Sequence, residues 1–423
     1  MLVNDIPPTS SSLASTGALR NAPSLSSIYV RVDKYVPDLE LERQLKKVVD
    51  GFWIDARQFL EQSGYKIHSK YDPTWTPTSE LQEKEADVLL PRFTLASAVR
   101  VKNNEPVILK QVEINTPEFE LAVFFSSPPL STDPRNHCVP IYDVLQFGKY
   151  GIIVMPQLRL FNDAPFDTVG EVLECFRQIL EGVQFMHQHH VAHRDCTLRN
   201  IMMDPTKMYP EGFHPGRPWM TADYSEFVSP RLTRAQCWPR YYLVDFGLSR
   251  RYDPAAGIPD EPVICGEDKT APEHHDDSRD GCNPFPTDIY YIGNILREYF
   301  IDSTKYGHDR RLGLEFLRPL MQEMVQDDPA RRPTIDEVVK RFYDLTQSLS
   351  YLHLRSLVQL SDATSIFYPV HHFGRWMKFT LTLKPPLPKD ISPPLTVLSP
   401  DLHDFYTQNR DNGLNVSFSS SFS

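Results

Sequence analysis

The sequence predicts an α+β protein in which a small β-rich lobe precedes a larger helical lobe. Two observations support this fold class. Strand-like segments lie between residues 91 and 155, and amphipathic helical patterns take over from about residue 168. Because the strands come first and the helices later, we expect the two kinds of element to be segregated rather than alternating.

A helix is predicted ahead of the strands. Apolar residues between Phe52 and Leu60 recur at the spacing of one helical face. Gly64 follows at the place where the glycine of a helix C-cap is expected.

The strand-like region should contain two short strands around a turn at Asn103 and Asn104, with residues 107–109 in the second strand. Residues 118–125 are compatible with a short helix, and the apolar run at residues 151–155 with a buried strand. These elements would build the sheet of the first lobe.

The helical region begins at an N-terminal signal. Thr168 and Glu171 have the spacing of a capping box, in which each side chain accepts a hydrogen bond from the other residue's backbone N–H. Apolar residues from Val172 to Val183 then fall on one helical face, so this helix should pack against a core.

The composition excludes several classes of protein. The 423 residues include 44 Lys and Arg against 55 Asp and Glu, a formal net charge of −11, which argues against nonspecific nucleic-acid binding. No apolar run approaches the roughly 20 residues of a membrane-spanning helix, and the first residues lack the pattern of a secretory signal. The six cysteines include no CxxC pair, so we expect reduced thiols and a cytoplasmic or nuclear location.

Many of the 37 prolines lie in tails and loops. Residues 1–27 are Ser-rich and almost uncharged, which predicts a disordered tail. Residues 384–400 are typical of extended polyproline, and the PxxP at residues 385–388 is either a linker or a ligand for a proline-reading module.

Three motifs carry the chemistry. Residues 193–200 read His-Arg-Asp-Cys-Thr-Leu-Arg-Asn, residues 245–247 read Asp-Phe-Gly after a strand-like segment, and residues 271–273 read Ala-Pro-Glu. In this combination the sequence resembles the eukaryotic protein-kinase superfamily. The resemblance extends to residues 288–293 and 328–334.

The resemblance covers roughly residues 91–350 and implies a bilobal protein-kinase-like fold. Residues 52–77 also resemble the extension before the kinase domain in a large family of fungal kinase-like proteins, and the glycine-rich loop is degenerate. The implied division is a tail at 1–27, an N-terminal extension packing near the N-lobe at 28–90, the N-lobe and hinge at 91–158, the C-lobe at 159–350, and a C-terminal extension with a Pro/Ser-rich tail at 351–423.

The resemblance assigns phosphoryl transfer to four side chains. Asp195 would orient the acceptor hydroxyl and take its proton. Asn200 and Asp245 would supply oxygen ligands to Mg²⁺. Lys110, at the end of a strand, would contact the α- and β-phosphates of ATP.

A helix glutamate should hold Lys110 in place. We prefer Glu120, because Phe124 four residues later can face the core, and Glu118 is the alternative.

The adenine site follows from the same resemblance. Met155 would be the gatekeeper, and the hinge would be Pro156-Gln157-Leu158, where the carbonyl of Pro156 and the N–H of Leu158 bond the base. Ile108 and Met202 would sandwich the ring.

Further positions match structural parts of the family. Glu273 and Arg332 would form a buried ion pair, and Asp288 would brace the backbone of the His-Arg-Asp motif. The activation segment implied by the resemblance runs from Asp245 to Glu273. In related kinases the arginine at the position of Arg194 binds a phosphorylated residue of this segment. That segment has few hydroxyls here, so we hypothesise that Arg194 instead meets one of its acidic residues, namely Asp260, Glu261, Glu267 or Asp268.

The chain also departs from the family. The glycine-rich phosphate loop is missing from residues 91–101, where we expect it. Thr197 stands where serine/threonine kinases usually carry lysine, and Arg199 has a tyrosine-kinase-like placement, so the acceptor type stays open. The long connection before Asp245 contains an insertion at about 208–240, which is either a docking element or a tolerated surface insertion.

We therefore expect a protein kinase that transfers the γ-phosphate of Mg-ATP to a protein hydroxyl. A pseudokinase acting as an interaction module is the main alternative, because the glycines are lost. A small-molecule phosphotransferase is a further one. The expected partners are ATP and a protein substrate, with docking through the 208–240 insertion or the Pro-rich tail.

Overall fold

The structure, a computed structural model, describes residues 39–388 apart from 77, 81–93, 265, 276–280, 303–312, 359–373, 375, 378, 380 and 383. The chain divides into two units, residues 1–50 and 51–423. The described part of the first unit is the beginning of helix α2. The tail predicted at 1–27 and the polyproline residues 389–400 lie outside the described residues, and the finer domain boundaries stay predictions.

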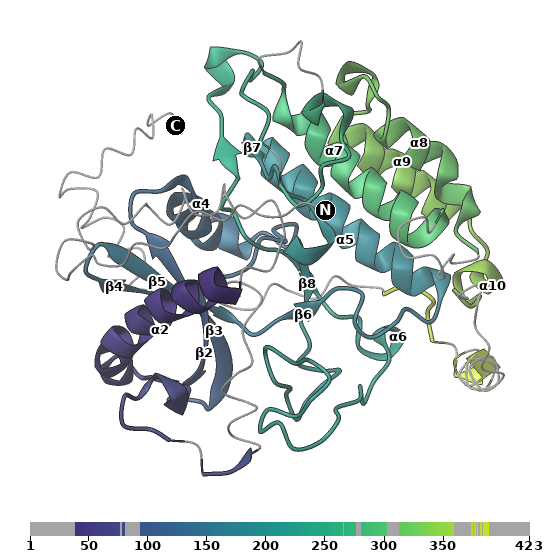
Figure 1. The fold of residues 1–423 in the computed structure, drawn as a ribbon. Coiled ribbons are helices and arrows are strands. Elements are labelled where there is room, and N and C mark those ends of the chain that lie inside the picture. Colours follow the sequence, from purple (N-terminus) through teal and green to yellow (C-terminus); the bar gives the residue numbers. More distant parts are fainter. Residues whose placement is uncertain are drawn as a thin grey trace, which may run out of the picture. The chain divides into compact units, whose positions relative to one another are not determined.

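An antiparallel sheet forms the first part of the second unit (Figure 1). Its strand order is β1-β2-β3-β5-β4, and every neighbouring pair is antiparallel. The strands are β1 (Tyr65–Ile67), β2 (Leu95–Arg100), β3 (Glu105–Glu113), β4 (Asp143–Phe147) and β5 (Tyr150–Pro156). The predicted hairpin is confirmed, with its turn at Asn104, whose φ is 55°.

Helix α2 (Leu39–Gln62) ends as the sequence predicts. Trp53 and Leu60 are fully buried, and the Phe52 ring packs edge-on against Phe147 and Tyr150 of the β4–β5 hairpin. The chain turns away at Gly64, whose φ of 85° lies in the left-handed region that glycine adopts without strain.

A helical region follows the sheet, so the described chain is a mixed α+β structure consistent with a kinase-like fold. Helix α9 packs on α5 and α8, and α7 packs on α8 (Figure 1). The helices are α4 (Pro117–Ser126), α5 (Val169–Gln188), α6 (Arg234–Cys237), α7 (Pro284–Ile295), α8 (Arg318–Met324), α9 (Ile335–Gln347) and α10 (Tyr351–Leu354).

Two small sheets link these helices to the first sheet. One has the order β6-β8-β9 and the other pairs β7 with β10. Their strands are β6 (Arg159–Leu160), β7 (Val191–Ala192), β8 (Ile201–Met203), β9 (Tyr241–Leu243) and β10 (Arg250–Arg251).

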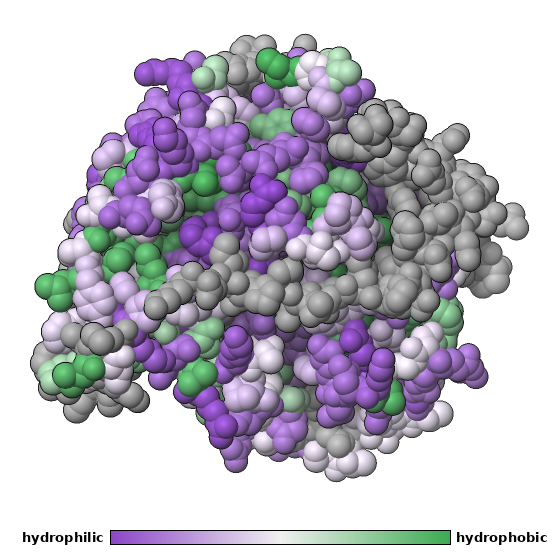
Figure 2. Space-filling view, turned by 180° about the vertical axis from the view of Figure 1, so that it is seen from behind, coloured by the Kyte–Doolittle hydropathy of each residue, from purple (hydrophilic) through white to green (hydrophobic). Residues whose placement is uncertain are grey.

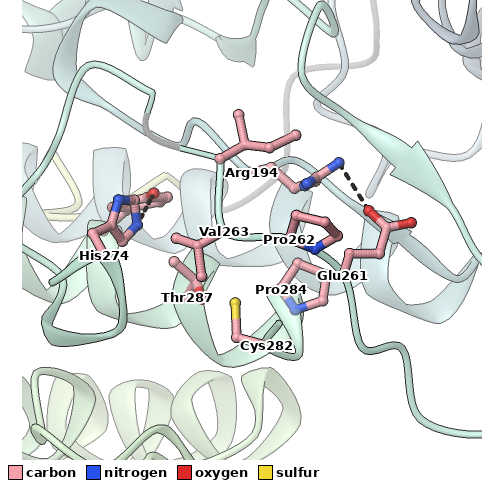
Figure 3. A pocket seen from close by; sticks show the side chains of 10 residues that line it. Arg194, Glu261, Pro262, Val263, His274, Cys282, Pro284 and Thr287 are labelled. Atoms are coloured by element: carbon pink, nitrogen blue, oxygen red, sulfur yellow. Dashed lines mark hydrogen bonds and ion pairs between the residues drawn. The ribbon is translucent and has the colours of Figure 1, made fainter. Parts of the chain in front are cut away.

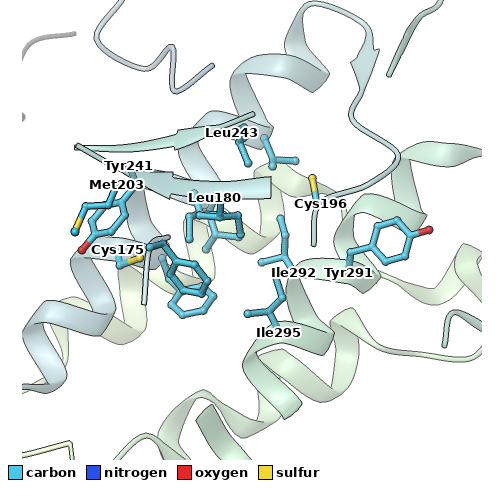
Figure 4. Close-up of a cluster of buried hydrophobic side chains, with 14 of the residues drawn as sticks. Cys175, Leu180, Cys196, Met203, Tyr241, Leu243, Tyr291, Ile292 and Ile295 are labelled. Atoms are coloured by element: carbon cyan, nitrogen blue, oxygen red, sulfur yellow. The ribbon is translucent and has the colours of Figure 1, made fainter. Parts of the chain in front are cut away.

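The core of the helical region is a continuous cluster of buried apolar side chains (Figure 4). Leu180 of α5, Leu243 of β9 and Ile292 of α7 belong to it and are each at most 1% exposed. The buried face of α5 thus agrees with the apolar pattern from Val172 to Val183. Hydrophilic side chains cover most of the coloured surface in Figure 2, with separate hydrophobic patches between them.

Of the two hydrogen bonds of the capping box predicted at α5, only one forms. The Thr168 hydroxyl accepts from the N–H of Glu171, but the Glu171 carboxylate accepts from the N–H groups of Asp167 and Ala235 instead of that of Thr168. Glu171 is buried, and burial raises its pKa. Its carboxylate therefore joins the start of α5 to α6, which belongs to the predicted insertion.

The two ends of the 208–240 insertion are built into the protein. Tyr209 and Phe213 are buried near its beginning, and the Arg159 guanidinium lies over both rings, with 4.0 Å to the centroid of Tyr209. Helix α6 near its end is buried as well. Between these two ends, Trp219 and Phe227 are 50% and 82% exposed. A purely tolerated surface insertion is therefore wrong for the two ends, while docking through this segment stays a prediction.

The PxxP segment is packed rather than extended away from the protein. Arg355 donates to the carbonyl oxygens of Lys384 and Pro385, at 2.8 and 2.7 Å. Leu387 packs against the main core, and a Cβ on Gly170 would lie 2.5 Å from the carbonyl oxygen of Pro386. Residues 384–388 thus lie against the beginning of α5.

No helix in the described part of the chain is both long and apolar enough to span a membrane.

Candidate active site

Strand β3 places the predicted lysine and adenine residues on one face of the sheet. Side chains two apart on a strand share a face, and so do directly paired residues on neighbouring strands. Ile108 pairs with Met155, and Lys110 pairs with Ile153. Ile108, Lys110 and Met155 therefore lie on the same face, with Met155 directly across from Ile108.

The Lys110 ammonium group joins the sheet to two acidic side chains. Its Nζ donates to Glu118 on α4 and lies 2.8 Å from Oδ1 of Asp245. Burial alone would lower the pKa of Lys110, but the carboxylates of Asp245 and Glu118 outweigh burial and raise it. Lys110 is therefore a buried cation held between two carboxylates.

The preferred pairing of Lys110 with Glu120 is wrong, and the alternative, Glu118, forms the ion pair with Lys110. Residues 118, 122 and 125 share one face of α4, whereas residue 120 is about 200° around the helix from residue 118. That face carries Phe125, whose ring centroid is 5.8 Å from that of Phe246, next to Asp245. Glu120 is half-buried, and burial raises its pKa.

Phe124, on which the choice of Glu120 rested, is only partly buried. The guanidinium of Arg251 lies 4.5 Å from its ring centroid, outside the face of α4 that meets Lys110. A single apolar neighbour was too little to decide which face of a short, apolar helix turns toward β3.

The loop after β7 brings Asp195 and Asn200 together. The Asn200 Nδ2 group donates to the backbone oxygen of Asp195 at 2.9 Å and to its Oδ2 at 2.7 Å. Both side chains are buried. The Val244 N–H donates to the Asn200 carbonyl oxygen at 2.9 Å, so this loop is bonded to the residue before Asp245.

These contacts join the four predicted side chains into one connected set. Lys110 meets Asp245, the residue before Asp245 is bonded to Asn200, and Asn200 meets Asp195. The described parts of the chain contain no group of three or more His, Cys, Asp or Glu side chains poised for a metal ion. A metal at Asn200 and Asp245 would therefore need ligands from elsewhere, such as phosphate oxygens.

Asp288 of α7 holds the backbone before Asp195. Its fully buried carboxylate accepts from the N–H groups of His193 and Arg194, at 2.8 and 2.7 Å. The φ of Arg194 is 68°, an uncommon value for a residue with a side chain. These two hydrogen bonds stabilise a backbone conformation that would otherwise be unfavourable.

Arg194 meets one of the four acidic residues considered for it. Its Nη1 lies 3.1 Å from Oε2 of Glu261, as Figure 3 shows. The Tyr252 hydroxyl donates to the same carboxylate oxygen at 3.1 Å. Arg194 and Glu261 also line a pocket with Val263, Cys282 and Thr287 (Figure 3).

The activation segment ends at the expected buried ion pair. Arg332 donates through Nη1 and Nη2 to the two oxygens of Glu273, both at 2.7 Å, and neither side chain is exposed. Thr287 adds a third hydrogen bond to Glu273. Burial raises the pKa of Glu273, but the bonds from Arg332 and Thr287 outweigh it and lower the pKa.

The remaining adenine residues lie on neighbouring elements. Pro156 is the last residue of β5 and pairs with Val107, and Leu158 is partly buried between β5 and β6. The Gln157 side chain donates to the carbonyl oxygen of Phe213, which ties the predicted hinge to the insertion. Met202 lies on β8 opposite Tyr242, and its adenine contact stays a prediction.

Most of residues 91–101, where the glycine-rich loop was expected, form a strand and not a loop. Residues 95–100 are strand β2, paired with β3 along their whole length. The connection between β1 and β2 comprises residues 68–94, and the sequence has no glycine between Gly64 and Gly148. The loss of glycine thus covers the whole connection ahead of β2.

The sequence did not reveal one group at this site. The backbone N–H of Glu267 donates to Oδ1 of Asp195 at 3.0 Å. Glu267 was considered only as a partner of Arg194. The sequence offered one signal for this contact, because Glu267 lies only six residues before Glu273 of the Ala-Pro-Glu motif.

The sheet, the helical region and the site are together consistent with a kinase-like fold. No protein-family model matches the chain. A 116-residue stretch, 27% of this chain and 23% of the other protein, is 28% identical to the serine/threonine-protein kinase CAK1 of Saccharomyces cerevisiae. An alignment of 255 positions, which covers 51% of this chain and 17% of the other protein, shows 21% identity to a light-sensor protein kinase of Ceratodon purpureus.

Both alignments span less than a quarter of the curated relatives' length. They indicate distant homology to protein kinases.

Proposed function

We propose that this chain is a protein kinase that transfers the γ-phosphate of Mg-ATP to a protein hydroxyl. The observation that carries the proposal is the connected set of Lys110, Asp245, Asn200 and Asp195, built from three separate segments, namely strand β3, the loop after β7 and the segment after β9. A buried cation, two carboxylates and an amide are the groups that phosphoryl transfer needs for charge neutralisation and positioning.

The residues present fit ATP and Mg²⁺. Asp245 and Asn200 offer the hard carboxylate and amide oxygens that Mg²⁺ prefers, and Lys110 lies beside them as a fixed positive charge. Lys110 would bind the α- and β-phosphates, with Glu118 holding its ammonium group. When bound, the metal would neutralise charge on the phosphate oxygens.

Asp195 is the proposed base. It would accept a hydrogen bond from the acceptor hydroxyl and take its proton as the hydroxyl oxygen attacks the γ-phosphorus. The bond from the γ-phosphorus to the β,γ-bridging oxygen would break, and ADP would leave. The contacts from Asn200 and Glu267 orient its carboxylate before substrate arrives. Such preorganisation lowers the cost of forming the transition state.

A peptide or protein acceptor is favoured by the activation segment. It ends in the buried Glu273–Arg332 pair and is fixed to α7 through the bond from Thr287. An ordered segment beside Asp195 provides a surface on which a polypeptide could lie. We leave serine, threonine and tyrosine as acceptors for the experiment to distinguish.

The proposal is tested by measuring nucleotide binding and phosphotransfer on the same samples. Wild type should be stabilised by Mg-ATP in a thermal-shift assay and should phosphorylate a degenerate peptide library. Asp195→Asn should keep the thermal shift and lose about 10²–10⁴ in transfer rate. Glu323→Ala, which removes an exposed ion pair with Arg341 between α8 and α9, is the control and should match wild type.

A pseudokinase is the second candidate, and the absence of glycine between Gly64 and Gly148 favours it. Backbone N–H groups approach phosphates most closely where no Cβ intervenes. Background transfer in both wild type and Asp195→Asn would support this alternative and contradict the kinase proposal, whether or not nucleotide still binds.

A further inference from the structure

Glu267 makes three contacts with the loop that carries Asp195. Its N–H donates to Oδ1 of Asp195 at 3.0 Å, and its Oε2 accepts from the Thr197 hydroxyl at 3.0 Å. Its Oε1 lies 2.9 Å from Nε of Arg199. One residue of the activation segment therefore binds three alternate residues of the loop, including the proposed base.

The residue before Glu267 shows how closely the two segments approach. A Cβ on Gly266 would lie 2.2 Å from Oδ1 and 2.8 Å from Cγ of Asp195. No side chain fits at that distance, so any residue larger than glycine would push the segment away from Asp195. The contact at Glu267 therefore depends on glycine at position 266.

The far side of the same segment is held by α7. The Asn294 amide donates to Oδ2 of Asp268 at 2.6 Å, and the Tyr290 hydroxyl donates to the carbonyl oxygen of Thr270 at 2.8 Å. Residues 267–270 are thus fixed between the Asp195 loop and a helix of the core. A shift of this segment would be transmitted to the carboxylate of Asp195.

We propose that Glu267 is a positioning residue for Asp195. Its side chain clamps Thr197 and Arg199, and this clamp holds its backbone N–H on the carboxylate of the base. The inference rests on the proposed kinase function for its effect on rate, but the clamp itself is a physical contact that can be measured without activity.

The side chain is expected to matter more for rate than for stability. Glu267 and Arg199 are 40% and 74% exposed, so their ion pair contributes little to folding. By contrast, Thr197, whose hydroxyl donates to Glu267, is buried and only 4% exposed. Misplacing a reacting group by a fraction of an ångström is sufficient to slow a reaction strongly.

The experiment compares full-length variants in three assays. Glu267→Ala removes both side-chain contacts, and Glu267→Gln keeps an oxygen that accepts from Thr197. Thr197→Val removes that hydroxyl with little change in shape. Glu323→Ala is the matched control, because Glu323 and Arg341 form a comparably exposed ion pair, 46% and 39%, between α8 and α9.

In the activity assay, Glu267→Ala and Thr197→Val should each lower kcat about 10- to 100-fold with KM for ATP unchanged. The double variant should be no slower than the slower single variant, because both remove the same clamp. Glu267→Gln should stay within about threefold of wild type. Equal losses in Mg-ATP binding, or a kcat unaffected by Glu267→Ala, would overturn the proposal.

In the hydrogen-exchange assay, the peptide containing the Glu267 amide should exchange about tenfold faster in Glu267→Ala and Thr197→Val than in wild type and Glu323→Ala. Unchanged exchange in both variants would overturn the clamp. If wild type transfers no phosphate, the proposed function fails, and the exchange result alone decides whether the clamp exists.

Discussion

The Nζ atom of Lys110 lies 2.8 Å from the carboxylate of Asp245, 135 residues further along the chain. This ion pair joins β3 of the first sheet to the segment after β9. Glu118 also pairs with the ammonium group, so Lys110 is held between two carboxylates from separate segments.

The two glutamates of α4 provide a matched pair of variants. Glu118→Gln should lower kcat/KM for Mg-ATP about 10- to 100-fold, because it weakens a charged hydrogen bond to a buried lysine. Glu120→Gln should leave kcat/KM within about twofold of wild type, since Glu120 lies on another face of the helix. Steady-state kinetics at several ATP concentrations measures both, and the reverse order would contradict the site.

The Arg194–Glu261 pair predicts an activation segment that is ordered without phosphorylation. Phosphatase-treated protein should retain its transfer rate, because the Glu261 carboxylate already neutralises Arg194. Glu261→Ala should lower the rate about tenfold, since it leaves a buried guanidinium without this partner. Tyr252→Phe is the control for modification of Tyr252. A rate that depends on a phosphorylated Tyr252 would contradict an activation segment that is ordered without phosphorylation.

The buried Glu273–Arg332 pair predicts a large loss of stability when one partner is removed. Arg332→Met should lower the free energy of unfolding by about 3–5 kcal/mol, because it strands a buried carboxylate. The double variant Glu273→Leu/Arg332→Met should recover part of that loss. Urea unfolding measures each, and an additive double variant would show that the pair does not act as a unit.

The same pair predicts a pH dependence. The pKa of Glu273 is lower in the folded protein than its ordinary value of 4.5. Its stabilising contribution is therefore present above about pH 4.5 and is lost as the pH falls through the folded pKa. Melting temperature should drop less steeply below pH 4.5 in Glu273→Gln than in wild type, and parallel curves would contradict this contribution.

The packed segment at residues 384–388 is tested at Gly170. Gly170→Ala places a methyl carbon 2.5 Å from the carbonyl oxygen of Pro386, so it should displace this segment and cost about 1–3 kcal/mol. Gly51→Ala is the control, because no atom lies within 4 Å of a Cβ there, and alanine is favourable in a helix. Equal stability of the two variants would show that residues 384–388 do not pack on α5.

Short-range patterns were predictable from the sequence. The turn at Asn104, the helix end at Gly64 and the apolar face of α5 all follow from residues close together in the chain. Motif spacing also singled out Lys110, Asp195, Asn200 and Asp245. The structure brings Lys110 into contact with Asp245 and Asn200 into contact with Asp195, and a backbone hydrogen bond from Val244 to Asn200 connects the two pairs. Their chemical roles remain proposals.

What failed depends on contacts between distant segments. The choice of Glu120 over Glu118 required knowing which face of α4 meets Phe246, which periodicity cannot decide in a helix with buried residues all around. The Glu171 carboxylate accepts a hydrogen bond from the N–H of Ala235, 64 residues away, and not from the N–H of Thr168 that a capping box requires. The Glu267 contact with Asp195 likewise depends on a backbone N–H, which carries no side-chain signature.

The most direct test of the central claim is a single-turnover assay of phosphate transfer from γ-labelled Mg-ATP to a peptide library. Wild type and Glu323→Ala should transfer label at equal rates, and Asp195→Asn should be slower by about 10²–10⁴. Equal rates in wild type and Asp195→Asn would show that Lys110, Asp245, Asn200 and Asp195 do not form a phosphotransfer centre.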